Sequence, residues 1–139
     1  MFNLVIVALD GSTHSLKALE YAREIAEKHS SKLILLHAYR STSDLRETEG
    51  YNQLVAKRKQ AGEAIIDDAC RRLGQVSFEF EKDLLEGPAA NAIVSAVAAR
   101  GADLVVMGTR GMGTFKGLLF GTVSTKVTHH APCPVLVVR

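Results

Sequence analysis

Short runs of aliphatic residues alternate along the chain with longer amphipathic segments. Four of these runs are nearly continuous in Val, Ile and Leu, and they lie at residues 4–9, 33–36, 104–107 and 135–138. Runs without polar alternation are typical of strands that are covered on both faces, and such burial is characteristic of parallel sheets. The pattern therefore predicts four buried strands of a parallel sheet.

The segments around these strands carry apolar residues at helical spacing. Proline is favourable in the first turn of a helix, and a helix usually ends before the residue that precedes a proline. Four helices are predicted on this basis: one from the repeat that begins at Leu16, one over residues 53–73, one from Gly87-Pro88 onward, and one over the segment VSTKVTHH, which ends before Ala131-Pro132.

A fifth strand is predicted at residues 76–81, where apolar and polar residues alternate. Val76, Phe78 and Phe80 share one face in this interpretation, and acidic side chains take the other. A strand exposed on one face belongs at the edge of a sheet. The order of strands and helices then predicts an α/β fold, with a single open five-stranded parallel sheet, right-handed crossovers and helices on both faces.

Composition narrows the class of protein. With 139 residues, of which 47% are hydrophobic and 23% charged, the chain suits one domain over residues 1–139. A net charge of +2 gives no sign of a nucleic-acid or anionic-membrane partner. The first apolar run is only about six residues long and follows no basic segment, so no signal peptide or membrane span is predicted and we expect a cytoplasmic protein.

Most other polar residues have modest interpretations. Cys70 and Cys133 fit no C-x-x-C or zinc spacing, which favours reduced, packed thiols. His37 ends a buried strand, where a hydrogen-bonded core residue is expected rather than a catalytic base. Asp67 and Asp68 have Arg71 and Arg72 at the spacing of solvated helix ion pairs. His129 and His130 lie at the end of the last predicted helix, where cationic side chains interact favourably with the helix dipole. Whether they bind a metal is left open.

The segment GTRGMGTFKGLLFGTVST, residues 108–125, holds five of the eleven glycines. It joins the end of a strand to the start of a helix, where unpaired amides and the helix dipole favour an anion and missing Cβ atoms admit it closely. Thr122 and Ser124 can add donors, and Arg110 and Lys116 supply positive charge nearby, with a solvated surface role as the alternative for either. No Gly-Lys-Ser/Thr P-loop occurs, and a dinucleotide motif would follow the first strand. The alternative is that the glycines only shape a loop.

Asp10, in VALDGS, follows the first strand. In a parallel sheet it lies at the same carboxyl edge as Gly108, where open α/β sheets bind ligands. A carboxylate there would accept hydrogen bonds from a ribose or help to hold hydrated magnesium. The alternative is a turn former and helix cap.

Four blocks of the sequence resemble the universal stress protein family, in the family's order and over essentially the whole chain. They are the opening VIVALDGSTHSLKALEYA, the strand LILLHA, the segment GADLVVMGTRG and the closing HHAPCPVLVVR. The motif G-x2-G-x9-G-[ST] of the nucleotide-binding branch is matched by Gly108, Gly111, Gly121 and Thr122. The resemblance implies a Rossmann-like sheet of order 3-2-1-4-5.

The same resemblance implies a site for ATP, with AMP and ADP as alternatives and with or without magnesium. The adenosine would be held by Ala8, Leu9, Asp10, Ala38, Met107 and Gly108. The phosphates would be held, mostly by backbone amides, by Arg110, Gly111, Gly121, Thr122, Val123 and Ser124. The family often has a proline and a small hydroxyl residue before the aspartate, whereas this chain has Ala8 and Leu9.

The leading hypothesis is an ATP-binding regulatory protein of the stress response, in which the nucleotide orders the glycine segment and the polar loop at residues 40–50. The uncharged run CPVLVV would form an exposed edge strand, which predicts a homodimer through the last strands. One alternative is a slow ATPase or phosphotransfer enzyme, although the sequence marks no nucleophile or catalytic residue. Another is a dimerisation module that binds no nucleotide.

Overall fold

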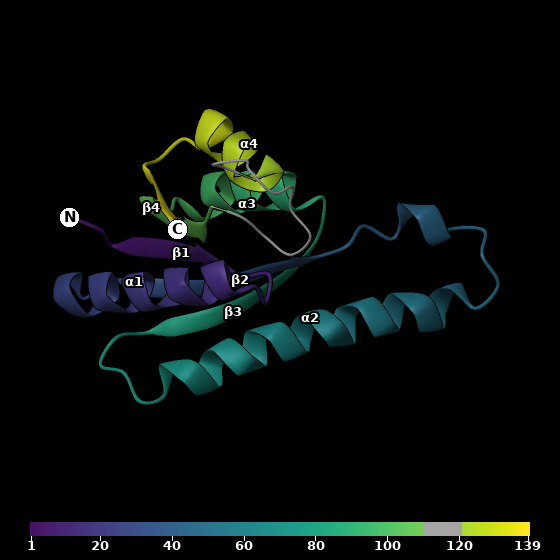
Figure 1. Ribbon diagram of the computed structural model, residues 1–139, viewed down its shortest axis with the longest axis horizontal. Helices are drawn as coiled ribbons and strands as arrows, with labels where there is room; N and C mark the ends of the chain where they lie inside the picture. Colours follow the sequence, from purple (N-terminus) through teal and green to yellow (C-terminus); the bar gives the residue numbers. More distant parts are fainter. Residues whose placement is uncertain (110–120) are drawn as a thin grey trace.

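The computed structural model describes residues 1–109 and 121–139 (Figure 1), so Arg110, Gly111 and Lys116 lie outside the described residues. The elements in chain order are β1 (Leu4–Ala8), α1 (Thr13–His29), β2 (Lys32–Tyr39), a 3-10 helix (Ser43–Leu45), α2 (Tyr51–Leu73), β3 (Phe80–Glu86), α3 (Ala89–Arg100), β4 (Leu104–Gly108), α4 (Thr122–His130) and β5 (Val135–Val138). The predicted helices are therefore confirmed within a few residues.

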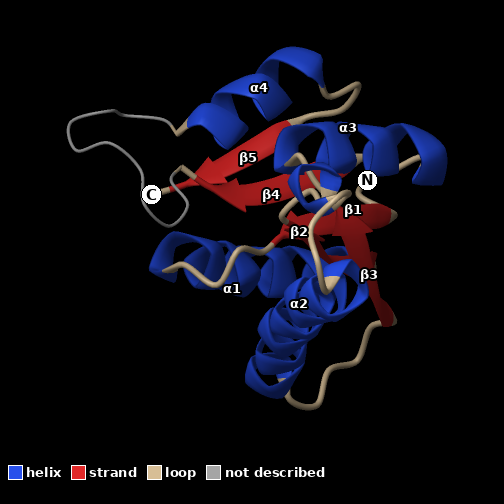
Figure 2. Cartoon of the chain, turned by 90° about the vertical axis from the view of Figure 1, so that its right-hand side faces the viewer, coloured by secondary structure: helices blue, strands red, loops and turns tan. Residues whose placement is uncertain are grey.

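The strands form one five-stranded sheet in the order β3-β2-β1-β4-β5. Every neighbouring pair is parallel, which confirms the predicted α/β fold and strand order. Figure 2 shows α1 and α2 on one face of this sheet and α3 and α4 on the other. Among the described residues, no helix is long and apolar enough to cross a lipid bilayer.

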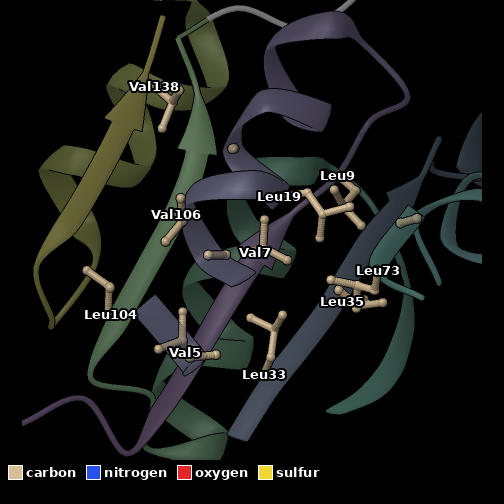
Figure 3. Packing of buried hydrophobic residues seen from close by; sticks show 14 of the residues in the cluster. Val5, Val7, Leu9, Leu19, Leu33, Leu35, Leu73, Leu104, Val106 and Val138 are labelled. Atoms are coloured by element: carbon tan, nitrogen blue, oxygen red, sulfur yellow. The ribbon is translucent and has the colours of Figure 1, made fainter. Parts of the chain in front are cut away.

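Two apolar clusters hold the layers together, one on each face of the sheet. Alternate residues of β1 divide between them: Val5 and Val7 pack beneath α1 and α2, as Figure 3 shows, and Ile6 packs beneath α3 and α4. All three side chains are fully buried. Each such side chain contributes about 1.5–3 kcal/mol by leaving water, so burial on both faces stabilises an aliphatic strand such as β1.

Local signals set the helix ends. The hydroxyl oxygen of Ser12 accepts a hydrogen bond from the Ser15 amide at 3.2 Å and caps α1. Ser30 ends the same helix in the left-handed conformation, and α2 ends at Gly74 with φ at 62°. Pro88 is the N-cap of α3, one position before its predicted role in the first turn.

The third strand was placed wrongly by the sequence pattern. β3 begins at Phe80 and continues to Glu86, whereas the alternation predicted residues 76–81. Phe78 is buried against the α1 and α2 cluster before the strand begins, while Phe80 is 36% exposed. Pairing with β2, from Leu33 opposite Phe80 onward, decides the strand's position. The predicted edge location and partial exposure are confirmed.

Charged side chains bracket this edge strand. The Nζ of Lys82 lies 3.1 Å from a carboxylate oxygen of Asp67 on α2. Asp67 therefore pairs across to the sheet, whereas Asp68 makes the predicted contact within α2, at 2.8 Å from Arg72 Nε. Glu81 pairs with Lys32 at 3.2 Å and also with Arg100. These exposed pairs add little stability individually, but they discourage pairing with another strand at this edge.

Candidate functional site

The direction of the strand order reverses between β1 and β4. The chain passes from β1 outward to β2 and β3, then returns across the sheet to β4 and β5. In open α/β sheets, ligands bind beyond the carboxyl ends of the strands at such a point. Most of the predicted site residues that the structure describes lie at the ends of β1 and β4 or at the start of α4.

Three small or flexible side chains share one face at this edge. Ala8 and Met107 contact the cluster under α3 and α4, and Ala38 follows Leu36 of that cluster by two positions along β2. Side chains two positions apart on a strand point to the same face. Ala8, Ala38 and Met107 therefore line the α3 and α4 side of three neighbouring strands, β2, β1 and β4.

Leu9 differs from these three residues. Its side chain is 4% exposed and belongs to the cluster under α1 and α2. Its amide donates to the Leu36 carbonyl at 2.8 Å, and its carbonyl oxygen lies 2.6 Å from Nδ1 of His37. Leu9 therefore extends the pairing of β1 with β2, and its side chain faces away from Ala8 and Met107.

Asp10 begins the turn that leads into α1. One carboxylate oxygen, Oδ1, accepts a hydrogen bond from the Ser12 amide at 2.9 Å, and Gly11 adopts the left-handed conformation with φ at 83°. The turn-forming role is thus present. The side chain is half-buried.

Gly108, at the end of β4, lies against the first turn of α1. A Cβ at this position would come within 2.7 Å of His14 Cβ and 2.9 Å of the His14 carbonyl carbon. Real Cβ atoms essentially never approach so closely, so the absence of a side chain here is required by packing. This contact gives Gly108 a structural role that the glycine pattern alone did not indicate.

The start of α4 is tied to the end of β4. The Gly121 amide donates to the Thr109 carbonyl at 2.6 Å, and the Ser124 hydroxyl lies 2.8 Å from that carbonyl and 3.1 Å from the Gly121 carbonyl. Ser124 is 2% exposed. Its single hydroxyl hydrogen is therefore used inside the protein, and its predicted role as a ligand donor rests on its amide.

Thr122 and Val123 are exposed, in contrast to Ser124. Helix geometry leaves the first amides of α4 without an intrahelical partner, and Gly121 makes no side-chain capping bond. The first intrahelical bond in this turn is donated by Thr125 to the Gly121 carbonyl at 3.1 Å. The positive end of the helix dipole therefore lies beside β4, together with the amides of Thr122, Val123 and Ser124.

A contact between β3 and the loop at residues 40–50 was not predicted from sequence. The buried Thr42 donates to Oε1 of Glu86 through its amide at 2.8 Å and its hydroxyl at 2.6 Å. These hydrogen bonds hold the pKa of the Glu86 carboxyl below its usual value. Since β2 and β3 end side by side, Glu86 lies where it fixes the first residues of the loop.

Arg58 on α2 holds the same loop from the other side. Its guanidinium donates to both carboxylate oxygens of Asp44, at 2.9 and 3.2 Å, and to the Ser41 carbonyl. The hydrogen bond from Arg58 lowers the pKa of the Asp44 carboxyl. Neither contact has a local sequence signal, because the residues that meet are 14 or more positions apart.

A pocket of about 310 Å³ adjoins the end of β3. Leu85, in its lining, is paired with Ala38 of β2 and contacts the cluster under α3 and α4. The pocket therefore lies beside the face that carries Ala8, Ala38 and Met107. The remaining lining residues are Glu86, Gly87, Pro88, Asn91, Ala92 and Ser95.

Titratable residues elsewhere have simple surroundings. Cys70 and Cys133 are free thiols, as predicted, and burial raises the pKa of each. His37 is buried and hydrogen-bonded, which confirms its prediction. In the described part of the chain, no three His, Cys, Asp or Glu side chains are grouped to hold a metal ion.

These features define a doubly wound α/β protein whose strand order reverses between β1 and β4. The family model described as the universal stress protein family matches residues 1–139. The chain belongs to the universal stress protein family.

Individual relatives agree with this assignment. A universal stress protein of Thermus aquaticus, encoded in the 3' region of a QAH/OAS sulfhydrylase gene, is 37% identical and both chains are covered completely. The universal stress protein UspA of Lactobacillus plantarum has the same fold, with a TM-score of 0.85 at 23% identity over 99% of this chain and 98% of that one. A universal stress protein solved in complex with cAMP is 27% identical, with a TM-score of 0.66 over 99% and 97% of the two chains.

Proposed function

We propose that this protein binds an adenine nucleotide, ATP in the first place, at the carboxyl edge of the sheet between β1 and β4. One observation carries the proposal: the apolar face of Ala8, Ala38 and Met107, the Asp10 turn and the N-terminus of α4 all lie at the carboxyl edge of the sheet. The cAMP complex of a relative at 27% identity supports an adenine nucleotide as the ligand.

The two halves of the site suit the two halves of a nucleotide. Small side chains at Ala8 and Ala38 leave room for a flat base, and Asp10 Oδ2 is an acceptor for ribose hydroxyls. The amides of Thr122, Val123 and Ser124 suit phosphate oxygens, as helix N-termini commonly do. Arg110 and Gly111, which lie outside the described residues, are proposed to complete the phosphate site. Magnesium bound together with ATP would neutralise part of the phosphate charge. The Asp10 carboxylate would then accept hydrogen bonds from water molecules of the hydrated ion.

The proposed role is regulatory and belongs to the stress response. The loop at residues 40–50 leaves the end of β2 one residue after Tyr39, so it starts close to Ala38. Glu86 and Arg58 already hold this loop through Thr42 and Asp44. A nucleotide beside Ala38 would shift the balance of these contacts and change the surface that protein partners meet.

The proposal includes a homodimer through β5. This strand pairs with β4 on one side and is the last strand of the sheet on the other. Val135, Leu136 and Val137 are only partly buried in the chain itself. Two such uncharged edges can pair antiparallel across a twofold axis.

Calorimetric titration with ATP, AMP and buffer alone tests the nucleotide proposal, together with mass spectrometry of any nucleotide that copurifies. Gly121→Val is expected to weaken ATP binding by about tenfold or more, since a branched side chain would stand between phosphate and the amides of α4. Gly121 has φ at −78°, a conformation that valine adopts, so backbone strain is not expected. Cys70→Ala on α2 is the control and should leave the affinity unchanged.

The remaining outcomes separate the alternatives. Equal affinity for Gly121→Val and the unmodified chain would contradict the phosphate site. No heat of binding with either nucleotide would favour a dimerisation module. Steady phosphate release that disappears in Asp10→Ala while ATP binding persists would favour a slow ATPase.

A further inference from the structure

His37 has an unusually well-defined place for a polar residue in the core. It lies near the end of β2, is 9% exposed, and faces the layer of α1 and α2. Its Nδ1 is 2.6 Å from the carbonyl oxygen of Leu9. Because a carbonyl oxygen only accepts hydrogen bonds, Nδ1 must carry the hydrogen and donate it.

The peptide group that receives this hydrogen bond is the one joining Leu9 to Asp10. Its other polar atom, the Asp10 amide nitrogen, donates to the hydroxyl oxygen of Ser15 at 3.3 Å. Ser15 is 3% exposed and donates in turn to the Ser12 carbonyl at 3.0 Å. A single peptide plane is thus held at its carbonyl by β2 and at its amide by α1.

Helix α2 restricts the imidazole further. Gly62 lies over the ring, and a Cβ at Gly62 would come within 3.0 Å of His37 Cδ2 and 2.7 Å of Leu84 Cδ1. The close approach of the Gly62 backbone leaves the ring little freedom to turn away from Leu9. The hydrogen bond to the Leu9 carbonyl is therefore preorganised by packing from a third element.

The orientation of this peptide plane determines where Asp10 points. The plane sets the direction in which the Asp10 Cα–Cβ bond leaves the backbone, and the hydrogen bond that Oδ1 accepts from the Ser12 amide then fixes the carboxylate. A change in the plane would therefore move the Asp10 carboxylate. We propose that His37 is a positioning residue of the nucleotide site, which aims the Asp10 carboxylate through the Leu9–Asp10 peptide.

This inference rests on the proposed function, because it assigns His37 a role in that same site. The competing interpretation is that His37 merely fills volume between β2 and α2. The two interpretations rank substitutions in opposite order. Asparagine places an N–H donor at the position of Nδ1 but fills less space, whereas phenylalanine fills the space of the ring and donates nothing.

The experiment compares His37→Asn and His37→Phe by calorimetry with ATP. Loss of one hydrogen bond to a preorganised turn is expected to weaken ATP binding by roughly three- to tenfold in His37→Phe, with most of the affinity retained in His37→Asn. Leu35→Val is a matched control, since Leu35 lies on the same face of β2 and is fully buried, but its side chain has no hydrogen-bond donor for the Leu9 carbonyl. It should lower stability without lowering the affinity of the folded protein.

Carbon-13 NMR gives a second readout that does not depend on nucleotide. The carbonyl signal of Leu9 and the side-chain carboxyl signal of Asp10 should move in His37→Phe and stay near their original positions in His37→Asn and Leu35→Val. Unmoved signals in His37→Phe, or an affinity lower in His37→Asn than in His37→Phe, would overturn the positioning role. Absence of ATP binding by the unmodified protein would instead overturn the proposed function, and the role of His37 in binding with it.

Discussion

Gly108 and His14 are in contact where the end of β4 meets the first turn of α1, with 2.7 Å between His14 Cβ and the position that a Gly108 Cβ would occupy. The close approach brings the Asp10 turn, the cap of α1 and the end of β4 together at one edge. One glycine of the glycine-rich segment thus serves helix packing, whatever its neighbours contribute to ligand binding.

Gly108→Ala is expected to lower the free energy of unfolding by about 1–3 kcal/mol, because the added Cβ meets backbone that cannot easily move. Urea unfolding measures the loss. The NMR amide signals of His14 and Ser15 should shift as well. Gly101→Ala is the contrasting variant: its φ of 67° is unfavourable for alanine, but its Cβ meets no atom within 4 Å, so the signals of His14 and Ser15 should not move. An unfolding free energy for Gly108→Ala within about 0.5 kcal/mol of the unmodified value would contradict this prediction. It would show that α1 can shift to accommodate the added Cβ at little energetic cost.

Ser124→Ala separates the hydroxyl of this residue from its amide. The variant loses the hydrogen bond to the Thr109 carbonyl, so we expect a destabilisation of about 1 kcal/mol in urea unfolding. The amide remains, and ATP affinity should fall much less than in Gly121→Val. Thr122→Ala, at an exposed position in the same turn, is the control and should change stability by less than about 0.5 kcal/mol. An ATP affinity as low in Ser124→Ala as in Gly121→Val would assign the Ser124 hydroxyl to the ligand.

Glu86 is expected to make stability depend on acidity. Hydrogen bonds from the Thr42 side chain and amide lower the pKa of Glu86 from its ordinary value of 4.5, so the native carboxyl holds its proton less tightly than the unfolded one. Its contribution is present above this ordinary pKa and is lost as the pH falls through the lower, native value. Glu86→Gln should therefore lose less unfolding free energy than the unmodified protein between about pH 6 and pH 3.

Glu20→Gln is the control for the acid dependence. Glu20 is exposed on α1 and has no ion pair among the described residues, so Glu20→Gln removes a carboxyl without removing a contact of the kind that Thr42 makes with Glu86. Parallel pH profiles for Glu86→Gln and the unmodified protein would contradict a stabilising role for the contact with Thr42.

Val137→Lys tests the proposed dimer. Val137 is partly exposed on β5 and lies in neither apolar cluster, so a charge at this position should disturb the edge more than the core. Sedimentation velocity at tens of micromolar should give a dimer for the unmodified chain and a monomer for the variant. Phe80→Lys, on the opposite edge strand, should remain dimeric. A monomeric unmodified protein would contradict the proposal.

Much of the fold was predictable because it depends on local pattern. Residues 4–9 and 104–107 were predictable as strands covered by helices on both faces, since uninterrupted aliphatic side chains favour such burial. The half-polar third strand had to lie at an edge, although its start was misplaced. The alternating pattern that ends at Glu81 is compatible with a strand and also with an extended segment that precedes a strand. Only the pairing with β2 shows where the strand begins.

The sequence by itself determined that the ends of β1 and β4 and the start of α4 lie at one edge of the sheet, because aliphatic runs and glycine positions are encoded locally. Only the tertiary structure decided how those residues are used. Leu9 turns away from Ala8, and Gly108 packs against His14. His37 holds the peptide before Asp10 from 28 positions away. Such contacts join segments that the chain separates, and their geometry follows from how the helices pack on the sheet.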